Sequence, residues 1–135
     1  MSITIKVHKA ADGKLKQQIE AGNNVWFADV DLASGGDDGG PDPHALLDSA
    51  LGACTALTVT MVAKHKQLPL EDVRVEITHQ EAGGVYHLER KIDLVGALSD
   101  EQRSYLLGIA NKCPIHKALS GKFEIATTLQ LASTK

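Results

Sequence analysis

Apolar and polar residues alternate in short runs along the first part of the chain. A period of two is typical of strands with one buried face. Asp12 and Gly13 separate the first two runs, and Asn23 and Asn24 precede the third; both pairs favour tight turns. The strands that we predict from this pattern cover residues 3–9, 14–20 and 25–30.

A segment rich in Gly and Asp follows at residues 34–40. Consecutive backbone N–H groups in such a segment can form an anion-binding nest. The segment lacks Lys and no GK[ST] sequence follows it, so it is not a phosphate-binding P-loop. We interpret it as a flexible, solvated connector in preference to a lid or an anion site.

The longest helical pattern covers residues 41–66, PDPHALLDSALGACTALTVTMVAKHK. Asp42 is a good N-cap, and Pro43 then occupies the first helical position, where its missing N–H is not needed. Gly52 costs about 1 kcal/mol relative to Ala in a helix interior, but it allows close approach of another element near Cys54. Apolar residues recur at three- and four-residue steps, so we expect them to form one buried stripe. The stripe consists of Leu46, Leu47, Ala50, Leu51, Cys54, Leu57, Met61 and Val62.

Alternation returns at residues 73–79 and 86–95, which predicts two further strands. Ser99 and Gln102 then have the spacing of a capping box, which predicts a helix that runs to about Asn111. The residues expected on its buried side are Leu106, Leu107, Ile109 and Ala110.

The last part of the chain begins with a short helical piece after Cys113, up to Leu119, and Gly121 ends it. Residues 123–131 alternate again and are predicted to form the last strand. The predicted order is βββ-α-ββ-α-β. Strands that cluster, instead of alternating with helices, indicate an α+β fold with a mostly antiparallel sheet.

Composition and charge restrict the class of protein. The 135 residues are enough for one domain, 1–135, with its own core. A net charge of −3 without a basic cluster argues against nucleic acid or anionic membrane as a partner. The first ten residues lack the apolar stretch of a signal peptide, and no apolar run approaches the roughly 18 residues of a membrane helix. We therefore expect a cytoplasmic protein without membrane contact.

The chain has two cysteines, Cys54 and Cys113. In a reducing compartment they are expected as thiols, and a lone buried cysteine is often only a small apolar core residue. Cys113 directly precedes Pro114 and is a plausible N-cap, where a helix N-terminus favours a thiolate. Cys54 lies in mid-helix and needs a cation or donor from another element. The two can meet only if their helices pack together.

Histidines offer a second kind of candidate. Cys113 and His116 could form half of a metal site with Cys54 as a third ligand, but a clear fourth ligand is missing, so we expect no metal. His116 is then a polar residue of the short helix or a donor near the Cys113 sulfur. The side chains of His8, His65, His79 and His87 are expected at the surface, and that of Asp48 is expected to face solvent or a polar dimer contact.

Two motifs together resemble the OsmC/Ohr family of thiol-dependent peroxidases: PDPHALLDSALGACTAL and, after a strand pair, SDEQRSYLLGIANKCPIHKAL. The resemblance covers nearly the whole chain. It implies an intertwined homodimer in which antiparallel sheet wraps two central helices. It also implies that Cys54 attacks an organic hydroperoxide, that Cys113 resolves the sulfenic acid as a disulfide, and that an external dithiol reduces this disulfide. No cofactor is implied.

The sequence departs from the characterised peroxidases of that family at two positions. They carry Glu where this chain has His44, and Arg where it has Ala11. Lys14, Lys16 or Arg90 could supply the missing cation. His44 could cap a substrate pocket, contact the partner chain, or simply face solvent in the first turn of its helix. The alternatives are a weakly active protein that binds an apolar ligand between its helices, and a structural dimer with inert thiols.

Overall fold

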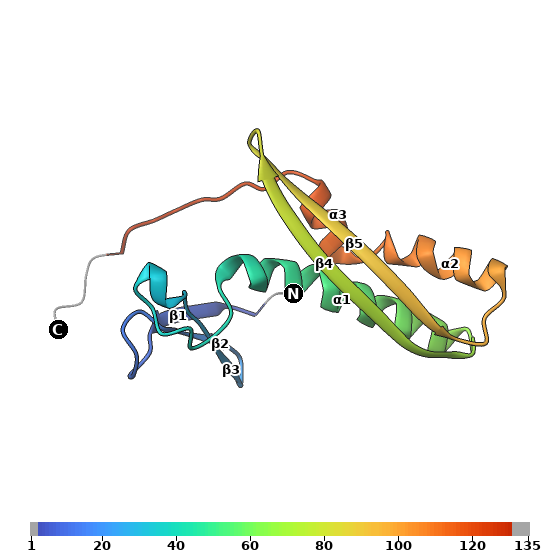
Figure 1. The fold of residues 1–135 in the computed structure, drawn as a ribbon, viewed down its shortest axis with the longest axis horizontal. Coiled ribbons are helices and arrows are strands. Elements are labelled where there is room, and N and C mark those ends of the chain that lie inside the picture. Colours follow the sequence, from blue (N-terminus) through green and yellow to red (C-terminus); the bar gives the residue numbers. More distant parts are fainter. Residues whose placement is uncertain (1–2, 131–135) are drawn as a thin grey trace. The chain divides into compact units, whose positions relative to one another are not determined.

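The computed structural model describes residues 3–130 (Figure 1). Its elements are β1 (Ile5–Lys9), β2 (Gln17–Ala21), β3 (Asn24–Ala28), the 3-10 helix η1 (Leu32–Ser34), α1 (Pro43–His65), β4 (Leu70–Ala82), β5 (Val85–Gly96), α2 (Asp100–Ala110) and α3 (Pro114–Ser120). The fold is α+β with antiparallel sheet, as predicted.

The chain divides into two compact units. The first comprises the chain up to Ala53 together with Val75–Ile92, and the second comprises Cys54–Arg74 together with the chain from Asp93 onward. Helix α1 and strands β4 and β5 contribute to both units, so the division follows no linker. The single domain stays a prediction.

The three N-terminal strands form the antiparallel sheet β1-β2-β3 that the alternation predicts. Val7 pairs with Ile19, and Ile19 pairs with Trp26. Strand β3 begins at Asn24, one residue earlier than expected, because Gly22 makes the turn with a φ of 60° that glycine adopts without strain. Ile19 is buried at the centre of the sheet.

The loop at residues 34–40 is largely exposed, as expected of a solvated connector, but it is also tied to the carboxylate of Asp29. The backbone N–H groups of Val30, Gly39 and Asp37 donate to this carboxylate at 2.8, 2.9 and 3.3 Å. These bonds, led by that from Gly39, hold the pKa of Asp29 below its usual value. A Cβ on Gly36 would lie 2.3 Å from the carbonyl oxygen of Val30, so the loop packs tightly. The nest of N–H groups is thus filled by the protein's own anion.

Helix α1 starts as predicted, since Asp42 accepts the N–H of Ala45 at 2.8 Å. The predicted buried stripe is wrong, however. Leu57 and Met61 are 63% and 66% exposed. The helix is apolar on almost every side, so periodicity could not tell which side the chain itself covers. The buried line instead runs at four-residue steps through Leu51, Thr55, Val59 and Ala63.

Helix α1 also corrects the expectation that no segment is long and apolar enough to span a membrane. By length and composition, this 23-residue helix could cross a membrane, although its apolar residues do not form a long uninterrupted run. Ser and Thr residues interrupt the apolar runs of α1 but carry no charge. A search for uninterrupted apolar runs therefore missed a helix whose mean hydropathy is high. The finding is weak evidence, because the core helices of soluble proteins meet the same criterion.

Strands β4 and β5 form a two-stranded antiparallel hairpin that is longer than predicted. Gly83 and Gly84 make its turn with φ of 59° and 75°. Alternate residues of β4, including Val75 and Ile77, are half-buried. A Cβ on Gly52 of α1 would lie 3.4 Å from Cγ1 of Ile77. The absence of a side chain at Gly52 therefore lets the helix approach this face of the hairpin, as expected.

The second unit is built around α2 and α3. Ser99 and Gln102 form the predicted capping box, with bonds of 3.1 and 2.9 Å. Leu106 and Ala110 are buried, whereas the predicted core residue Leu107 is 53% exposed. An 11-residue helix buries only the narrow side that faces its own unit. The fully buried larger side chains of this unit are Thr55, Val59, Leu106 and Cys113.

The last predicted strand is not formed in the part of the chain that the structure describes. Residues 122–130 have neither helix nor strand, and Phe123, Ile125 and Leu129 are 61%, 85% and 96% exposed. A strand needs an edge to pair with, and neither described sheet includes this segment. Leu131, the last residue of the predicted strand, lies outside the described residues.

Candidate thiol site and a histidine–carboxylate cluster

Cys113 is the N-cap of α3, as predicted. Its backbone is extended, and its Sγ accepts the backbone N–H of His116 at 3.2 Å. The side chain is completely buried. An N–H donated to a sulfur at a helix N-terminus favours the thiolate, whereas burial in an apolar surrounding opposes it. The expected donor near this sulfur is therefore the backbone of His116.

Cys54 lies in the middle of α1 and is half-buried, with a free thiol. Its Sγ is 3.8 Å from Oγ1 of Thr58, one helical turn later. Residues four apart share one side of a helix, so the hydroxyl is placed to donate to a thiolate. Thr58 was missed in the sequence, although its spacing of four from the cysteine is the signal that could have found it.

Helix α1 and the start of α3 contact each other in the second unit. Oγ1 of Thr55 lies 4.0 Å from Sγ of Cys113. Thr55 directly follows Cys54, and consecutive Cα atoms are about 3.8 Å apart. The helix that carries Cys54 thus packs against the start of α3 at the next residue, although adjacent side chains of a helix point about 100° apart.

The two lysines proposed as cations lie in the first unit, where each is paired with a carboxylate. Nζ of Lys14 is 3.8 Å from Asp37. Nζ of Lys16 is 3.0 Å from Asp12 and lies 4.8 Å from the centre of the Phe27 ring. Their support of the Cys54 thiolate stays a prediction, and it requires an ammonium group to leave its present partner.

Arg90, the third candidate cation, lies on the half-buried face of β5, where it alternates with exposed residues. Its role beside a thiolate also stays a prediction. Ala11, where the resembled peroxidases carry Arg, is exposed in the bend between β1 and β2.

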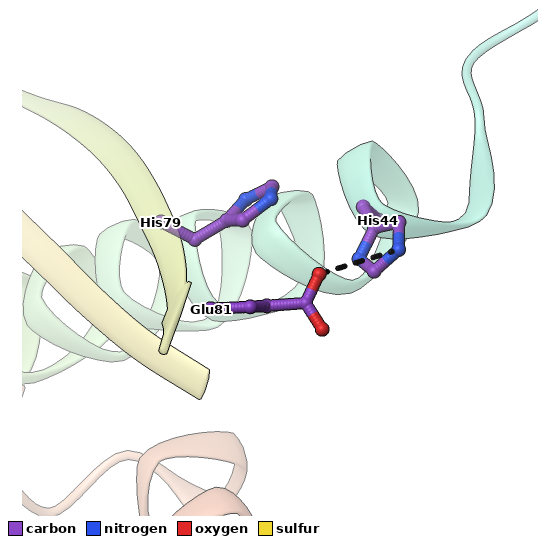
Figure 2. A group of neighbouring side chains, drawn as sticks. All are labelled: His44, His79 and Glu81. Carbon is purple, nitrogen blue, oxygen red and sulfur yellow. Dashed lines mark ion pairs between the residues drawn. The ribbon is translucent and has the colours of Figure 1, made fainter. Parts of the chain in front are cut away.

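The side chain of His44 lies near those of His79 and Glu81 in the first unit (Figure 2). Nε2 of His44 is 3.9 Å from a carboxylate oxygen of Glu81. The ring of His44 also stacks on those of His79 and Tyr86, with centroids 5.3 and 5.7 Å apart. His44 therefore belongs to a cluster of interacting side chains that also contains His79, Glu81 and Tyr86.

His79 is not the surface residue that we expected, and Asp48 makes its polar contact within the chain. Nδ1 of His79 is 2.5 Å from Asp48, and the Tyr86 hydroxyl donates to the other oxygen of Asp48 at 2.8 Å. Desolvation, the bond to Asp48 and neighbouring carboxylates raise the pKa of Tyr86 to about 12. Alternation along β4 places His79 on the half-buried face, which is the signal that could have identified it.

The chain is therefore a small α+β protein whose longest helix carries one thiol and whose short third helix is capped by a second. The OsmC-like protein family model matches residues 35–128. The chain belongs to the OsmC-like family. No curated protein matches the sequence.

Solved structures show the same fold at low identity. A protein of Psychrobacter arcticus described as a putative osmotic stress induced and detoxification response protein is 21% identical, over 85% of this chain and 86% of that chain, with a TM-score of 0.72. An OsmC-like protein of Mycoplasma pneumoniae is 18% identical over 90% and 89%, with a TM-score of 0.71. An organic hydroperoxide resistance protein of Legionella pneumophila is 20% identical over 90% of each chain, with a TM-score of 0.62.

Proposed function

We propose that this protein reduces organic hydroperoxides in the cytoplasm, as part of defence against oxidative stress, with Cys54 and Cys113 as its redox pair. The observation that carries the proposal is the difference between the two thiols. Cys54 is partly accessible and Cys113 is completely buried, yet the Cys113 sulfur lies beside the residue that follows Cys54. The printed names of structural neighbours from Legionella pneumophila and Bacillus subtilis, both organic hydroperoxide resistance proteins, also support it.

In the proposed reaction the Cys54 thiolate attacks the terminal oxygen of the hydroperoxide. An S–O bond forms, the O–O bond breaks, and the alkoxide leaves as an alcohol after taking a proton, so Cys54 becomes a sulfenic acid. Cys113 then attacks this sulfur, the S–S bond forms and water leaves. An external dithiol supplies two electrons and two protons and restores both thiols.

The geometry supports an order for these steps. A hydroperoxide reaches the partly exposed Cys54 first, whereas Cys113 is reached only from within the protein. The N–H of His116 stabilises Cys113 as a thiolate, which is the form that attacks a sulfenic acid. A disulfide needs Cα atoms within about 7 Å, and Cys54 points about 100° away from Thr55 around the helix, so resolution requires a movement that brings the Cys113 sulfur from Thr55 to Cys54.

We also propose that the protein acts as a homodimer. Cys54, Leu57 and Met61 follow each other at three- and four-residue spacing on the side of α1 that the single chain leaves uncovered. Apolar patches of this kind mark interaction surfaces. A second copy that covers this side of α1 places Cys54 in an apolar surrounding, which suits an alkyl or aromatic hydroperoxide better than hydrogen peroxide.

Intact-mass spectrometry after one equivalent of cumene hydroperoxide, beside the same experiment with hydrogen peroxide, tests the redox function. The expected product has lost two hydrogens, with the bond mapped to Cys54 and Cys113, and forms faster with the organic peroxide. Cys54→Ser should abolish turnover, and Cys113→Ser should trap a sulfenic acid after the first oxidation. A first oxidation that Cys113→Ser blocks would reverse the two roles.

A second function is favoured by the same uncovered apolar side of α1 and by the replacement of Glu and Arg with His44 and Ala11. In this case the protein binds an apolar ligand at the dimer interface with little catalysis. Thiols that stay reduced under both oxidants, together with saturable binding of a fluorescent fatty acid that Met61→Glu abolishes, would establish this second function.

A further inference from the structure

Three metal-ligating side chains converge in the first unit (Figure 2). His44 comes from the first turn of α1, and His79 and Glu81 lie two residues apart on β4. Each offers one ligand atom, and these three atoms all lie within 4.8 Å of one another. Two imidazoles and one carboxylate form the three-residue ligand set of many catalytic zinc sites, in which a fourth position is left for water.

The surroundings of His79 match what a metal-binding histidine needs. Its Nδ1 is hydrogen-bonded to Asp48, and the carboxylate of Asp48 is itself held by the hydroxyl of Tyr86. A histidine ligand almost always donates its other ring N–H to a carboxylate, which fixes the tautomer and the orientation of the ring. With the proton on Nδ1, the lone pair of Nε2 is available for a metal.

The charges of the cluster also suit a dication. Glu81 and Asp48 bring two negative charges, which balance one divalent ion. The Glu81 carboxylate lies 3.9 Å from Nε2 of His44, and the Asp48 carboxylate is hydrogen-bonded to His79. Carboxylates gathered in this way attract cations.

We propose that His44, His79 and Glu81 bind a divalent transition-metal ion of the Zn²⁺ type, with Asp48 as the outer-shell partner of His79. In a tetrahedral zinc site the ligand atoms are about 3.4 Å apart, so the set must close slightly around the ion. The rings of His44 and His79 are 25° from parallel, and coordination requires His44 to turn. The side chains of His44 and Glu81 are 50% and 60% exposed, so both have room to move.

This site is independent of the thiol chemistry, and its test is arranged to keep the two apart. Zinc also binds thiolates, so the measurements use the Cys54→Ser/Cys113→Ser double variant as the parent protein. Isothermal titration with ZnCl₂ should give one ion per chain. Co²⁺ should give the visible absorption of a low-symmetry site, without the thiolate charge-transfer band that cysteine ligands produce.

Four variants of this parent protein locate the site. His44→Ala and His79→Gln should each weaken zinc binding at least tenfold. Gln is chosen at position 79 because its amide can still donate a hydrogen bond to Asp48, which helps the variant to fold. Asp48→Asn should weaken it about 10- to 100-fold while leaving all three ligands in place. His8→Ala is the control, because His8 forms a similar exposed pair with Glu20 at 3.0 Å on another part of the unit.

Far-UV circular dichroism checks that each variant is folded. Unchanged zinc affinity in folded His79→Gln and Asp48→Asn would overturn the proposal. An equal loss of affinity in His8→Ala would also overturn it, since it would mean that zinc binds surface histidines in general. A parent protein that binds no zinc at micromolar concentration would also overturn the proposal.

Discussion

The hydroxyl oxygen of Thr55 and the sulfur of Cys113 lie 4.0 Å apart, and both side chains are completely buried. This contact joins the middle of α1 to the N-cap residue of α3. Cys113 therefore has a structural role in addition to its proposed chemistry: it fills part of the core and caps a helix.

The structural role of Cys113 predicts different stabilities for two substitutions. Ser at this position keeps an oxygen that can accept the N–H of His116, whereas Ala removes the cap and leaves a small void. The loss of a side-chain N-cap costs about 1 kcal/mol. Cys113→Ala should therefore be about 1–2 kcal/mol less stable than Cys113→Ser in urea unfolding followed by circular dichroism. Equal stability of the two variants would mean that the cap contributes nothing.

The hydroxyl of Thr58 should speed the first oxidation of Cys54, because it is placed to donate to the thiolate. Thr58→Val keeps the branched shape and removes the donor. A hydrogen bond of this kind contributes about 0.5–1.5 kcal/mol, so the rate constant for loss of the first thiol should fall about 2- to 10-fold. The measurement is stopped-flow oxidation in the Cys113→Ser background. Thr60→Val, an exposed threonine of the same helix, is the control and should leave the rate unchanged.

Local signals in the sequence predicted local structure well. The caps at Asp42, Ser99 and Cys113 are each read from residues within three positions, and the structure confirms all three. The same reasoning failed for the buried side of α1. A helix that is apolar all round carries no information on which side its own chain covers, and Thr55, a polar residue, is among its most buried side chains.

The histidine–carboxylate cluster shows the other limit of sequence reasoning. His79 was predicted on a strand and lies on one, but its partner Asp48 is 31 residues away in sequence. No local pattern connects the two residues, because their contact depends on how the hairpin packs on α1. The thiol site could be predicted from the sequence because the chain has only two cysteines. The six histidines are too many for their number alone to show which of them form a site.

The uncovered side of α1 predicts that charge at Leu57 disrupts the proposed homodimer. A Glu at this position puts an ionised group on the apolar surface that a second copy should cover, and a buried unpaired charge is costly. Sedimentation velocity should show a dimer for the wild-type protein and a monomer for Leu57→Glu. Leu32→Glu is the matched control, because Leu32 is 71% exposed but belongs to η1 and not to the apolar side of α1. A wild-type monomer, or a dimer that both variants retain, would contradict the proposal.

The carboxylate of Asp29 predicts how the stability of the protein depends on pH. Its pKa is lowered in the folded state, chiefly by the N–H of Gly39, relative to about 3.9 in an unfolded chain. The folded protein therefore holds this proton less tightly than the unfolded chain. The stability that Asp29 contributes is complete above about pH 5 and is lost as the pH falls through 3.9 and then through the lower folded value.

Asp29→Asn removes this titration but keeps an oxygen that can accept one N–H. Its free energy of unfolding should lie below that of the wild type at pH 7, and the gap should narrow steadily below about pH 4, as measured by urea unfolding between pH 7 and 2.5. The other acids of the protein titrate in both proteins and cancel in the difference. Asp38→Asn, an exposed aspartate of the same loop at a φ of 54° that Asn also adopts, should show a constant gap. A gap for Asp29→Asn that does not change with pH would show that the carboxylate, when charged, does not hold the loop at residues 34–40.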